Sequence, residues 1–363
     1  MKKDRAGFWF GKNVLVTGIN GFIGGNLAKG LLENGANVFG LVRNAAHDTF
    51  LFYEKLDNRI TLIEGEITDK DLLTRIVSEE QINAVFHLAA QVEVGVGLTN
   101  PYLTFETNTR GTWCLMEAIR CCPQTIEAVV VASTDKAYGS YPADRMPYKE
   151  DYPLLPQYPY DVSKACGDMI ARTYANEIYK LPVVVTRFCN IFGPGQLNFS
   201  ALIPDAARAC LGYGKFVPRG SGRQIRDFIF AGDVVDLYLR IGENLARNAN
   251  SLRGRVYNAG TNQPRAVRDV LETVAATVAP AGTILHDIDP DQLRDSSWYQ
   301  KFPLWSGRGS SPVMAMDNSL ALSLGMPQTP LELTTMETAE WLATQEAPSW
   351  WLSADDESAL LRR

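Results

Sequence analysis

Short apolar runs alternate with longer stretches of helical periodicity over the first half of the chain. We expect the apolar runs to form buried strands, at residues 14–17, 36–42, 60–63, 84–90, 128–132 and 183–187. Between them, apolar residues recur at the spacing typical of helices, most clearly over residues 104–120 and 160–179. This alternation predicts the α/β class, with a doubly wound parallel (Rossmann) sheet that helices cover on both faces.

The first strand leads directly into a glycine-rich turn. Gly18, Gly21 and Gly24 follow it at a spacing of three, and a helical stretch begins there. A strand that turns sharply into a helix directs backbone N–H groups and the positive end of the helix dipole at one point, which suits a pyrophosphate. Glycine permits both the turn and the close approach of phosphate. The pattern predicts a dinucleotide site, and a plain tight turn is the alternative.

The end of the second strand bears on which dinucleotide binds. Sites for NAD usually carry an acidic residue about 20 positions beyond the glycines, which binds the ribose 2′-hydroxyl, whereas an arginine there can pair with a 2′-phosphate. This chain has Arg43 at the position and no neighbouring carboxylate. The sequence therefore favours NADP over NAD, although Arg43 could also stack on adenine or face water.

The periodic pattern changes after residue 189. Gly193, Pro194 and Gly195 interrupt it, and residues 280–330 are irregular and rich in proline, serine, tryptophan and aspartate. The predicted dinucleotide-binding domain comprises residues 1–189 and 227–279. Residues 190–226 and 280–346 are predicted to form a smaller, discontinuous ligand-binding domain over the carboxyl ends of the strands, where ligands of open α/β sheets bind. Residues 347–363 are predicted to be a polar tail.

Composition argues against several other classes of function. The net charge is −6 and no long basic run is present, which argues against nucleic acid or an anionic membrane surface as a partner. No segment reaches the roughly 20 apolar residues of a membrane span. Three scattered histidines argue against a histidine-based metal site, and six cysteines without Cys-x-x-Cys spacing indicate reduced thiols in a cytoplasmic protein.

Tyr160 and Lys164 lie four residues apart at the start of a predicted helix, so they share one face. A tyrosine is a poor base at its usual pKa of about 10, but a neighbouring ammonium and a bound nicotinamide ring would lower that pKa. The pair could then take a proton from a sugar or alcohol hydroxyl while hydride leaves the same carbon. The alternative is that both residues belong to an ordinary helix surface.

Thr134, Asp135 and Lys136 follow the fifth strand, at the edge of the sheet where a site is expected. The hydroxyl of Thr134 could hydrogen-bond the reacting alcohol, while the carboxyl group gives a proton and the amine accepts one. A capped turn with both charges in water is the alternative. Arg219 and Arg226 belong to a basic stretch that could clamp a diphosphate, or could be a solvated loop.

Taken together, these motifs resemble those of the extended short-chain dehydrogenase/reductase family. The matching segments are Thr17-Gly18-x-x-Gly21-Phe22-Ile23-Gly24, His87-Leu88-Ala89-Ala90, Asn108 in Asn-Thr-Arg-Gly-Thr, Tyr160-x-x-x-Lys164, Arg187-x-x-Asn190-x-x-Gly193-Pro194 and Arg226-Asp227-Phe228. Within the family, Ser133-Thr134-Asp135-Lys136 is similar to the nucleotide-sugar 4,6-dehydratases. Lys136 in place of the usual glutamate, together with Phe8-Trp9-x-Gly11-Lys12 and Ala89-Ala90-Gln91, is most similar to CDP-glucose 4,6-dehydratases. The inverting UDP-N-acetylglucosamine 4,6-dehydratases also carry Thr-Asp-Lys.

The resemblance implies a nucleotide-diphosphate sugar as substrate and a hydride that passes from C4 to C6 with loss of water. Tyr160, helped by Thr134, would deprotonate the 4-hydroxyl. Lys136 would remove H5, and Asp135 would protonate the leaving 6-hydroxyl. The cofactor, NADP or NAD, would be regenerated and stay bound. A homodimer through the helices at 104–120 and 160–179 is also implied. An epimerase or reductase of the same family, which would not need Asp135 or Lys136, is the alternative.

The resemblance also implies binding residues. Those for the cofactor are Gly18, Asn20, Gly21, Phe22, Ile23, Gly24, Arg43, Glu66, Ile67, Leu88, Ala89, Ala90, Asn108, Ser133, Tyr160 and Lys164. Those for the substrate are Gln91, Asn190, Leu202, Ile203, Arg219 and Arg226. From the residues alone, Asn108 could instead tether a catalytic loop or lie on the surface. Residues 92–97 lack the polar or basic side chains of many dehydratases, so the sugar contacts there could differ.

Overall fold

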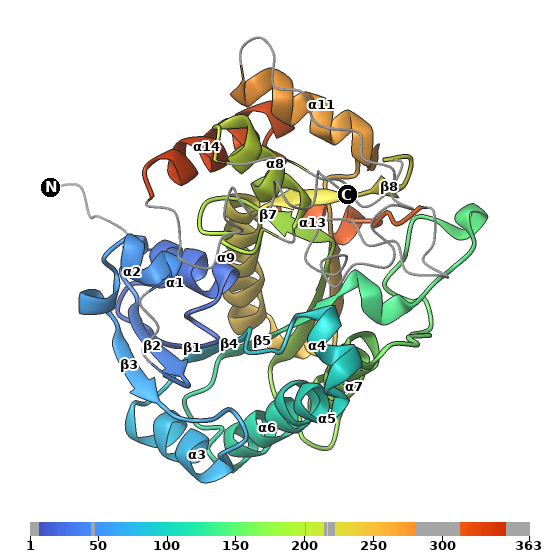
Figure 1. Cartoon of the computed structure of the whole chain (residues 1–363). Coiled ribbons are helices and arrows are strands. Elements are labelled where there is room, and N and C mark those ends of the chain that lie inside the picture. Colours follow the sequence, from blue (N-terminus) through green and yellow to red (C-terminus); the bar gives the residue numbers. More distant parts are fainter. Residues whose placement is uncertain are drawn as a thin grey trace, which may run out of the picture.

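Seven strands form one parallel sheet in the computed structural model, which describes residues 7–44, 48–199, 201–213, 216, 222–279 and 313–345 (Figure 1). Their order across the sheet is β10-β6-β5-β4-β1-β2-β3. The strands are β1 (Asn13–Thr17), β2 (Asn37–Val42), β3 (Thr61–Glu64), β4 (Ala84–His87), β5 (Ala128–Thr134), β6 (Val183–Phe188) and β10 (Val256–Ala259). The order reverses between β1 and β4, which confirms the doubly wound fold, and ligands of such sheets bind at the carboxyl ends of the strands at this point.

Helices cover both faces of the sheet. On one face lie α1 (Phe22–Glu33) and α9 (Ala231–Arg247), and on the other α3 (Lys70–Glu79), α6 (Gly111–Cys121) and α7 (Pro159–Tyr174). Successive strand residues point to opposite faces. Accordingly, alternate residues of β1 enter two separate hydrophobic cores, and this explains why the buried strands are continuously apolar.

A third hydrophobic core lies apart from the sheet. It is built by α8 (Leu202–Cys210), α11 (Val267–Val278) and α14 (Leu331–Ala343), which pack together in the upper part of Figure 1. Two pairs of short strands accompany it: β7 (Asn190–Phe192) with β9 (Phe228–Phe230), and β8 (Ile225–Arg226) with β11 (Arg265–Ala266). The predicted domain boundaries stay a prediction, and most of residues 280–330 lies outside the described residues, as do residues 347–363.

The shorter helical elements complete the described chain. They are α2 (Phe50–Tyr53), α4 (Val94–Thr99), α5 (Pro101–Phe105), α10 (Ala249–Leu252) and α13 (Ser319–Ser323), with 3-10 turns η1 (Asp57–Arg59), η3 (Asp135–Tyr138) and η4 (Ala143–Arg145), and a π-helical turn η2 (Glu106–Arg110). Across the described residues, no helix combines the length and apolar composition that crossing a membrane requires.

Three predicted elements differ from the structure. The helix expected over 104–120 starts earlier, at Pro101, and contains the π-helical turn η2. The strand expected over 84–90 leaves the ladder after His87. Helix α7 ends at Tyr174 rather than near residue 179, because the side chain of Asn176 accepts hydrogen bonds from the backbone N–H groups of residues 178 and 179 and so favours a turn.

Candidate functional site

The glycine-rich turn between β1 and α1 has no room for side chains at two positions. Gly18 has a φ of +73°, and a Cβ there would lie 2.7 Å from the backbone nitrogen of Ala89. A Cβ on Gly24 would lie 2.2 Å from the backbone oxygen of Gly18. Phe22 and Ile23 form the first turn of α1 directly after Gly21. The turn therefore has the bare backbone that close approach of a pyrophosphate requires.

Two buried oxygen atoms near this turn and at the end of β5 lack partners in the described part of the chain. They are Oδ1 of Asn20 and Oγ of Ser133. Buried polar atoms are normally hydrogen-bonded, so both positions suit a polar ligand. Together with the bare glycine turn, they fit a dinucleotide at this place. NAD(P) would be held there by the glycine turn, Asn20 and Ser133.

The remaining residues predicted to bind the cofactor follow strands at the same end of the sheet, and they differ in how exposed they are. Arg43 is exposed directly after β2, and Glu66 is exposed after β3. Leu88, Ala89 and Ala90 are half-buried after β4. Ile67, by contrast, is buried and lies against Gly111, so its backbone is the part that could face a ligand.

Asn108 ties the site together from the π-helical turn. Its side-chain Oδ1 accepts from the backbone N–H of Gln91 at 2.7 Å, and its Nδ2 donates to the backbone oxygen of Gln91 at 3.0 Å and to Oγ of Ser163 at 2.9 Å. The side chain is buried. Asn108 therefore links the segment after β4 to helix α7. Of the two alternatives for this residue, the structure agrees with the tether and not with a surface position.

His87 is buried beneath the site as a neutral connector. Its Nδ1 lies 2.8 Å from Oγ1 of Thr17, and its Nε2 lies 3.0 Å from Oγ1 of Thr112. Burial, and then the charge of Lys164, lowers the pKa of His87 to about 3. The imidazole therefore links β1, β4 and α6 without carrying charge.

Thr134, Asp135 and Lys136 form a compact turn at the end of β5. Oγ1 of Thr134 donates to Oδ1 of Asp135 at 3.0 Å and accepts from the backbone N–H of Lys136 at 3.3 Å. Asp135 is buried, and Nζ of Lys136 lies 3.4 Å from its Oδ1. The charge of Asp135 raises the pKa of Lys136. The two groups pair with each other rather than lying in bulk water.

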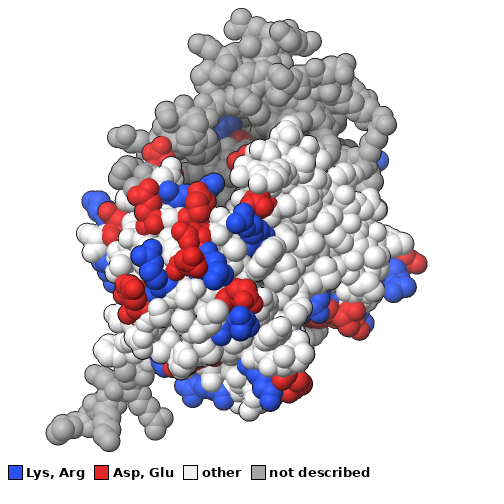
Figure 2. Space-filling view, turned by 90° about the horizontal axis from the view of Figure 1, so that it is seen from below, with Lys and Arg blue, Asp and Glu red and all other residues white. Residues whose placement is uncertain are grey.

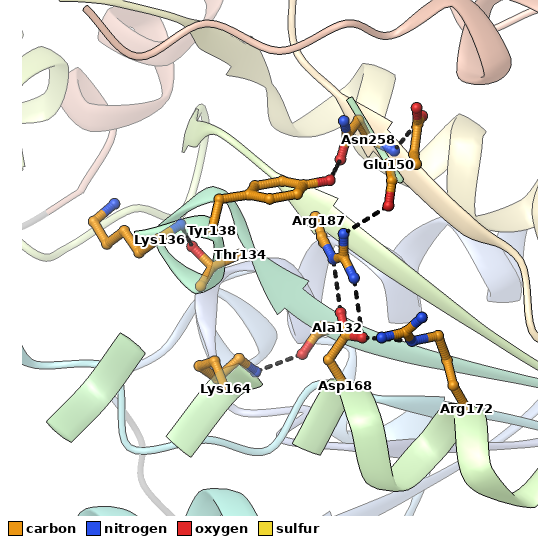
Figure 3. A network of polar contacts seen from close by, with 10 residues as sticks. All are labelled: Ala132, Thr134, Lys136, Tyr138, Glu150, Lys164, Asp168, Arg172, Arg187 and Asn258. Carbon is orange, nitrogen blue, oxygen red and sulfur yellow. Dashed lines mark hydrogen bonds and ion pairs between the residues drawn. The ribbon is translucent and has the colours of Figure 1, made fainter. Parts of the chain in front are cut away.

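Tyr160 faces this turn from the start of α7. The side chain of Thr134 and the charges of Lys136, Asp135 and Asp161 are near enough to act on the pKa of its hydroxyl. Lys164, one turn later, donates instead to the backbone oxygen of Ala132 (Figure 3). The structure brings the predicted catalytic residues together at one place.

The expected lowering of the Tyr160 pKa by Lys164 is not found. Burial raises the pKa of Tyr160, and the largest opposing effect comes from the ammonium of Lys136. Burial also lowers the pKa of Lys164 to about 8. Helical spacing predicts that Lys164 lies near Tyr160. The larger effect comes from Lys136, because the turn after β5 lies against the start of α7, and spacing along the chain does not reveal that contact.

Asp161 is a charged neighbour that the sequence analysis missed. It lies in the first turn of α7, and its charge acts on Lys136 and Tyr160. Burial raises the pKa of Asp161 to about 6. The sequence signal that could have identified Asp161 is its position directly after Tyr160.

The predicted substrate residues are spread around the site. Oε1 of Gln91 accepts from Thr104 at 3.0 Å, and Asn190 donates to the backbone oxygen of Asp227 at 3.3 Å. Arg226 is close enough to Asp135 for the carboxylate charge to raise its pKa, although burial lowers it overall. Leu202 and Ile203 are buried in the third core.

Arg219 lies outside the described residues. The roles of all these residues stay predictions. No group of three or more His, Cys, Asp or Glu residues that could hold a metal ion occurs in the described part of the chain.

Comparison with known protein sequences adds independent evidence. The chain is 30% identical over 263 residues to human dTDP-D-glucose 4,6-dehydratase, an alignment that covers 70% of each protein. It is 29% identical over 360 residues to a trifunctional UDP-glucose 4,6-dehydratase, 3,5-epimerase and reductase of Arabidopsis thaliana. That alignment covers 96% of this chain, which spans only 49% of the plant protein.

Solved structures with the same architecture include a dehydratase and an epimerase. The dTDP-glucose 4,6-dehydratase of Bacillus anthracis in complex with NAD has a TM-score of 0.73 and 26% identity, covering 94% of this chain and 98% of that chain. The UDP-glucose 4-epimerase of Thermotoga maritima with UDP-glucose has a TM-score of 0.72 and 26% identity, covering 91% of this chain and 98% of that chain.

A family model described as GDP-mannose 4,6 dehydratase matches residues 15–298. The matched segment includes the glycine turn, the turn after β5 and the Tyr160–Lys164 pair. The chain therefore belongs to the GDP-mannose 4,6 dehydratase family, within the extended short-chain dehydrogenases/reductases.

Proposed function

We propose that this chain is an NAD(P)-dependent nucleotide-sugar 4,6-dehydratase. The observation that carries the proposal is the ion pair of Asp135 with Lys136, in a turn near enough for both charges to act on the Tyr160 hydroxyl. Alcohol oxidation alone needs only a base beside the hydroxyl. Removal of water across C5 and C6 needs a base and an acid as well, and the site holds an amine and a carboxyl group for those tasks.

Each proton in the proposed reaction has a named acceptor or donor. NAD(P) bound at the glycine turn would supply the acceptor for the C4 hydride and later return that hydride to C6. Tyr160, oriented by Thr134, takes the proton of the 4-hydroxyl. The resulting 4-keto group acidifies H5, which Lys136 removes as a proton. Asp135 protonates the 6-hydroxyl, which leaves as water while the C5–C6 double bond forms.

The final step restores the starting state of the site. Hydride adds to C6, and C5 accepts a proton from the ammonium of Lys136. Tyr160 releases the proton of the former 4-hydroxyl to solvent, and Asp135 takes one proton back from solvent, so both groups regain their starting protonation. The product is the 4-keto-6-deoxy sugar nucleotide, and the net loss is one molecule of water, so no external oxidant or reductant is consumed.

CDP-glucose is the substrate that we propose to test first. The support is Lys136 in place of glutamate and the segments 8–12 and 89–91, which are similar to CDP-glucose enzymes. The dehydratases named above use dTDP-glucose or UDP-glucose. For the cofactor, exposed Arg43 after β2 supports NADP, whereas the Bacillus anthracis structure contains NAD.

We also propose that two copies pair through α5, α6 and α7. These helices expose Tyr102, Trp113 and Met169, whose exposed fractions are 73%, 52% and 49%. Figure 2 shows a wide area without charged side chains on the face seen from below, on the side where α5 and α7 lie in Figure 1. Large exposed apolar side chains such as these three are typical of protein interfaces when they form a continuous patch. Sedimentation of wild-type chain and Trp113→Glu tests the pairing, and a monomeric wild type would contradict it.

An epimerase is the second candidate, favoured by the similarity to the Thermotoga maritima structure. The two functions are separated by incubating the protein with CDP-glucose, dTDP-glucose, GDP-mannose and UDP-N-acetylglucosamine in the presence of NAD or NADP. A dehydratase yields a product lighter by one water. An epimerase yields a product of unchanged mass, which would contradict the proposal.

A further inference from the structure

Arg187 of β6 lies at the centre of a buried polar network behind the candidate site (Figure 3). Its side chain is almost fully buried. Nε donates to Oδ2 of Asp168 at 2.8 Å, and Nη2 donates to Oδ1 at 3.1 Å, which makes the contact bidentate. Asp168 lies on α7 one helical turn beyond Lys164, so this pair fastens the helix that carries Tyr160 and Lys164 to the sheet.

The same guanidinium also holds the turn that carries Asp135 and Lys136. The ring of Tyr138, the last residue of η3, lies 4.7 Å from the guanidinium carbon of Arg187. The hydroxyl of Tyr138 donates to Oδ1 of Asn258 on β10 at 2.7 Å. Nη1 of Arg187 donates in addition to the backbone oxygen of Glu150 at 3.1 Å.

From this arrangement we infer that Arg187 is a positioning residue that sets the spacing between the Asp135–Lys136 turn and the Tyr160–Lys164 helix. The inference rests on the proposed function for the roles of those four residues. A fixed spacing matters because Tyr160 and Lys136 would act on adjacent carbons of one sugar. A misplacement of about 1 Å can reduce the rate of a reaction about 100-fold.

Arg172 offers a matched comparison. Its Nε donates to Oδ1 of the same Asp168 at 2.8 Å, but it lies on α7 itself and is partly exposed. Figure 3 shows Arg172 on the opposite side of Asp168 from the turn that carries Thr134 and Lys136. Arg172→Lys therefore perturbs a partner of Asp168 without touching the turn, whereas Arg187→Lys keeps the charge and loses the planar fork that reaches both elements.

The first measurement is amide hydrogen exchange, which needs no substrate. The informative group is the N–H of Gly139, which donates to the backbone oxygen of Lys136 at 3.0 Å and closes the turn. In Arg187→Lys, a loss of about 1.4 kcal/mol of local stability would make exchange over residues 135–139 about tenfold faster than in wild type. In Arg172→Lys, exchange over these residues should be unchanged. Equal exchange in all three proteins would overturn the inference.

The second measurement follows the two halves of the reaction with a sugar nucleotide that the wild type converts. Arg187→Lys should lose about 100-fold in the rate of water loss and keep most of its cofactor reduction, because the turn moves relative to α7. A merely structural role would reduce both halves alike, and that result would overturn the inference. If the wild type converts no sugar nucleotide, the proposed function fails, but the exchange comparison still decides whether Arg187 holds the turn.

A second variant protects the test against misfolding of Arg187→Lys. Tyr138→Leu leaves the Arg187–Asp168 pair in place and removes the ring that the guanidinium covers. It should show the same faster exchange over residues 135–139. If folded Tyr138→Leu exchanged these amides at the wild-type rate, the contact between the Tyr138 ring and the guanidinium would not be what holds the turn.

Discussion

Nζ of Lys136 lies 3.4 Å from Oδ1 of Asp135, and both residues belong to the turn that follows β5. In the resting pair, the proton is on the amine, because the charge of Asp135 raises the pKa of Lys136. The proposed elimination needs the opposite form, with a neutral amine and a protonated carboxyl group. Both forms contain the same number of protons, so a transfer within the pair is sufficient to prepare the site.

Substituting Asp135 and Lys136 one at a time should separate oxidation at C4 from the loss of water. Asp135→Asn cannot donate a proton to the leaving hydroxyl, and Lys136→Met cannot accept H5. Each should lose about 100-fold to 10,000-fold in water loss, the usual contribution of general acid–base groups. Absorbance of the reduced nicotinamide in a single turnover should still rise in both variants. Full dehydration by either protein would contradict the assigned roles.

Asp161→Asn should shift the acidic limb of the pH profile of kcat/KM toward lower pH. The carboxylate of Asp161 raises the pKa of both Tyr160 and Lys136, and Asp135 acts on Tyr160 in the same direction. Both bases must lose a proton to act, so removal of one negative charge lets them do so at lower pH. Asp144→Asn, in the η4 turn, is the control. An unchanged limb, or one moved to higher pH, would argue against this electrostatic coupling.

His87 should make the fold less stable in acid. Its pKa is about 3 in the folded protein, compared with 6.5 for an exposed imidazole. Between these values the unfolded chain binds more protons, so the free energy of unfolding falls as the pH drops from 6.5 toward 3, by roughly 3 to 5 kcal/mol in total. His87→Gln should flatten this dependence in urea titrations at several pH values. An identical slope in both proteins would show that His87 titrates normally.

Gly24→Ala should impair cofactor binding. The added Cβ would lie 2.2 Å from the backbone oxygen of Gly18, so the turn must move, at a cost of about 1 to 3 kcal/mol in the free energy of unfolding. Calorimetric titration with NAD and NADP measures the loss of binding affinity. Gly7→Ala is the control, since nothing lies within 4 Å of its added Cβ. Undiminished affinity in Gly24→Ala would place the dinucleotide elsewhere.

The parallel sheet could be predicted from sequence because its strands are short, continuous apolar runs between helical stretches. The strands expected at 14–17 and 183–187 are found as β1 and β6, each one residue longer than expected. Helix α4 was not predicted, because Val94–Thr99 contains two glycines and no polar face. The π-helical turn at Asn108 was also missed, because it depends on hydrogen bonds to Gln91 and Ser163, which lie far away in the sequence.

For the site, local spacing was enough to group Tyr160 with Lys164 and to single out the turn after β5. It could not show that Lys136 rather than Lys164 provides the largest charge effect that lowers the pKa of Tyr160, because that depends on how the turn and α7 face each other. Asp168 lies four residues beyond Lys164, which helical spacing could have revealed. Its pairing with Arg187 required the packing of α7 on β6.

The most direct test of the dehydratase proposal uses a sugar nucleotide with deuterium on C4, in ordinary water. Mass spectrometry and NMR of the product locate the label. The proposed mechanism predicts a product lighter by one water that carries the deuterium on C6, with no label lost to free cofactor. A product of unchanged mass with deuterium on C4 would contradict the mechanism and indicate an epimerase.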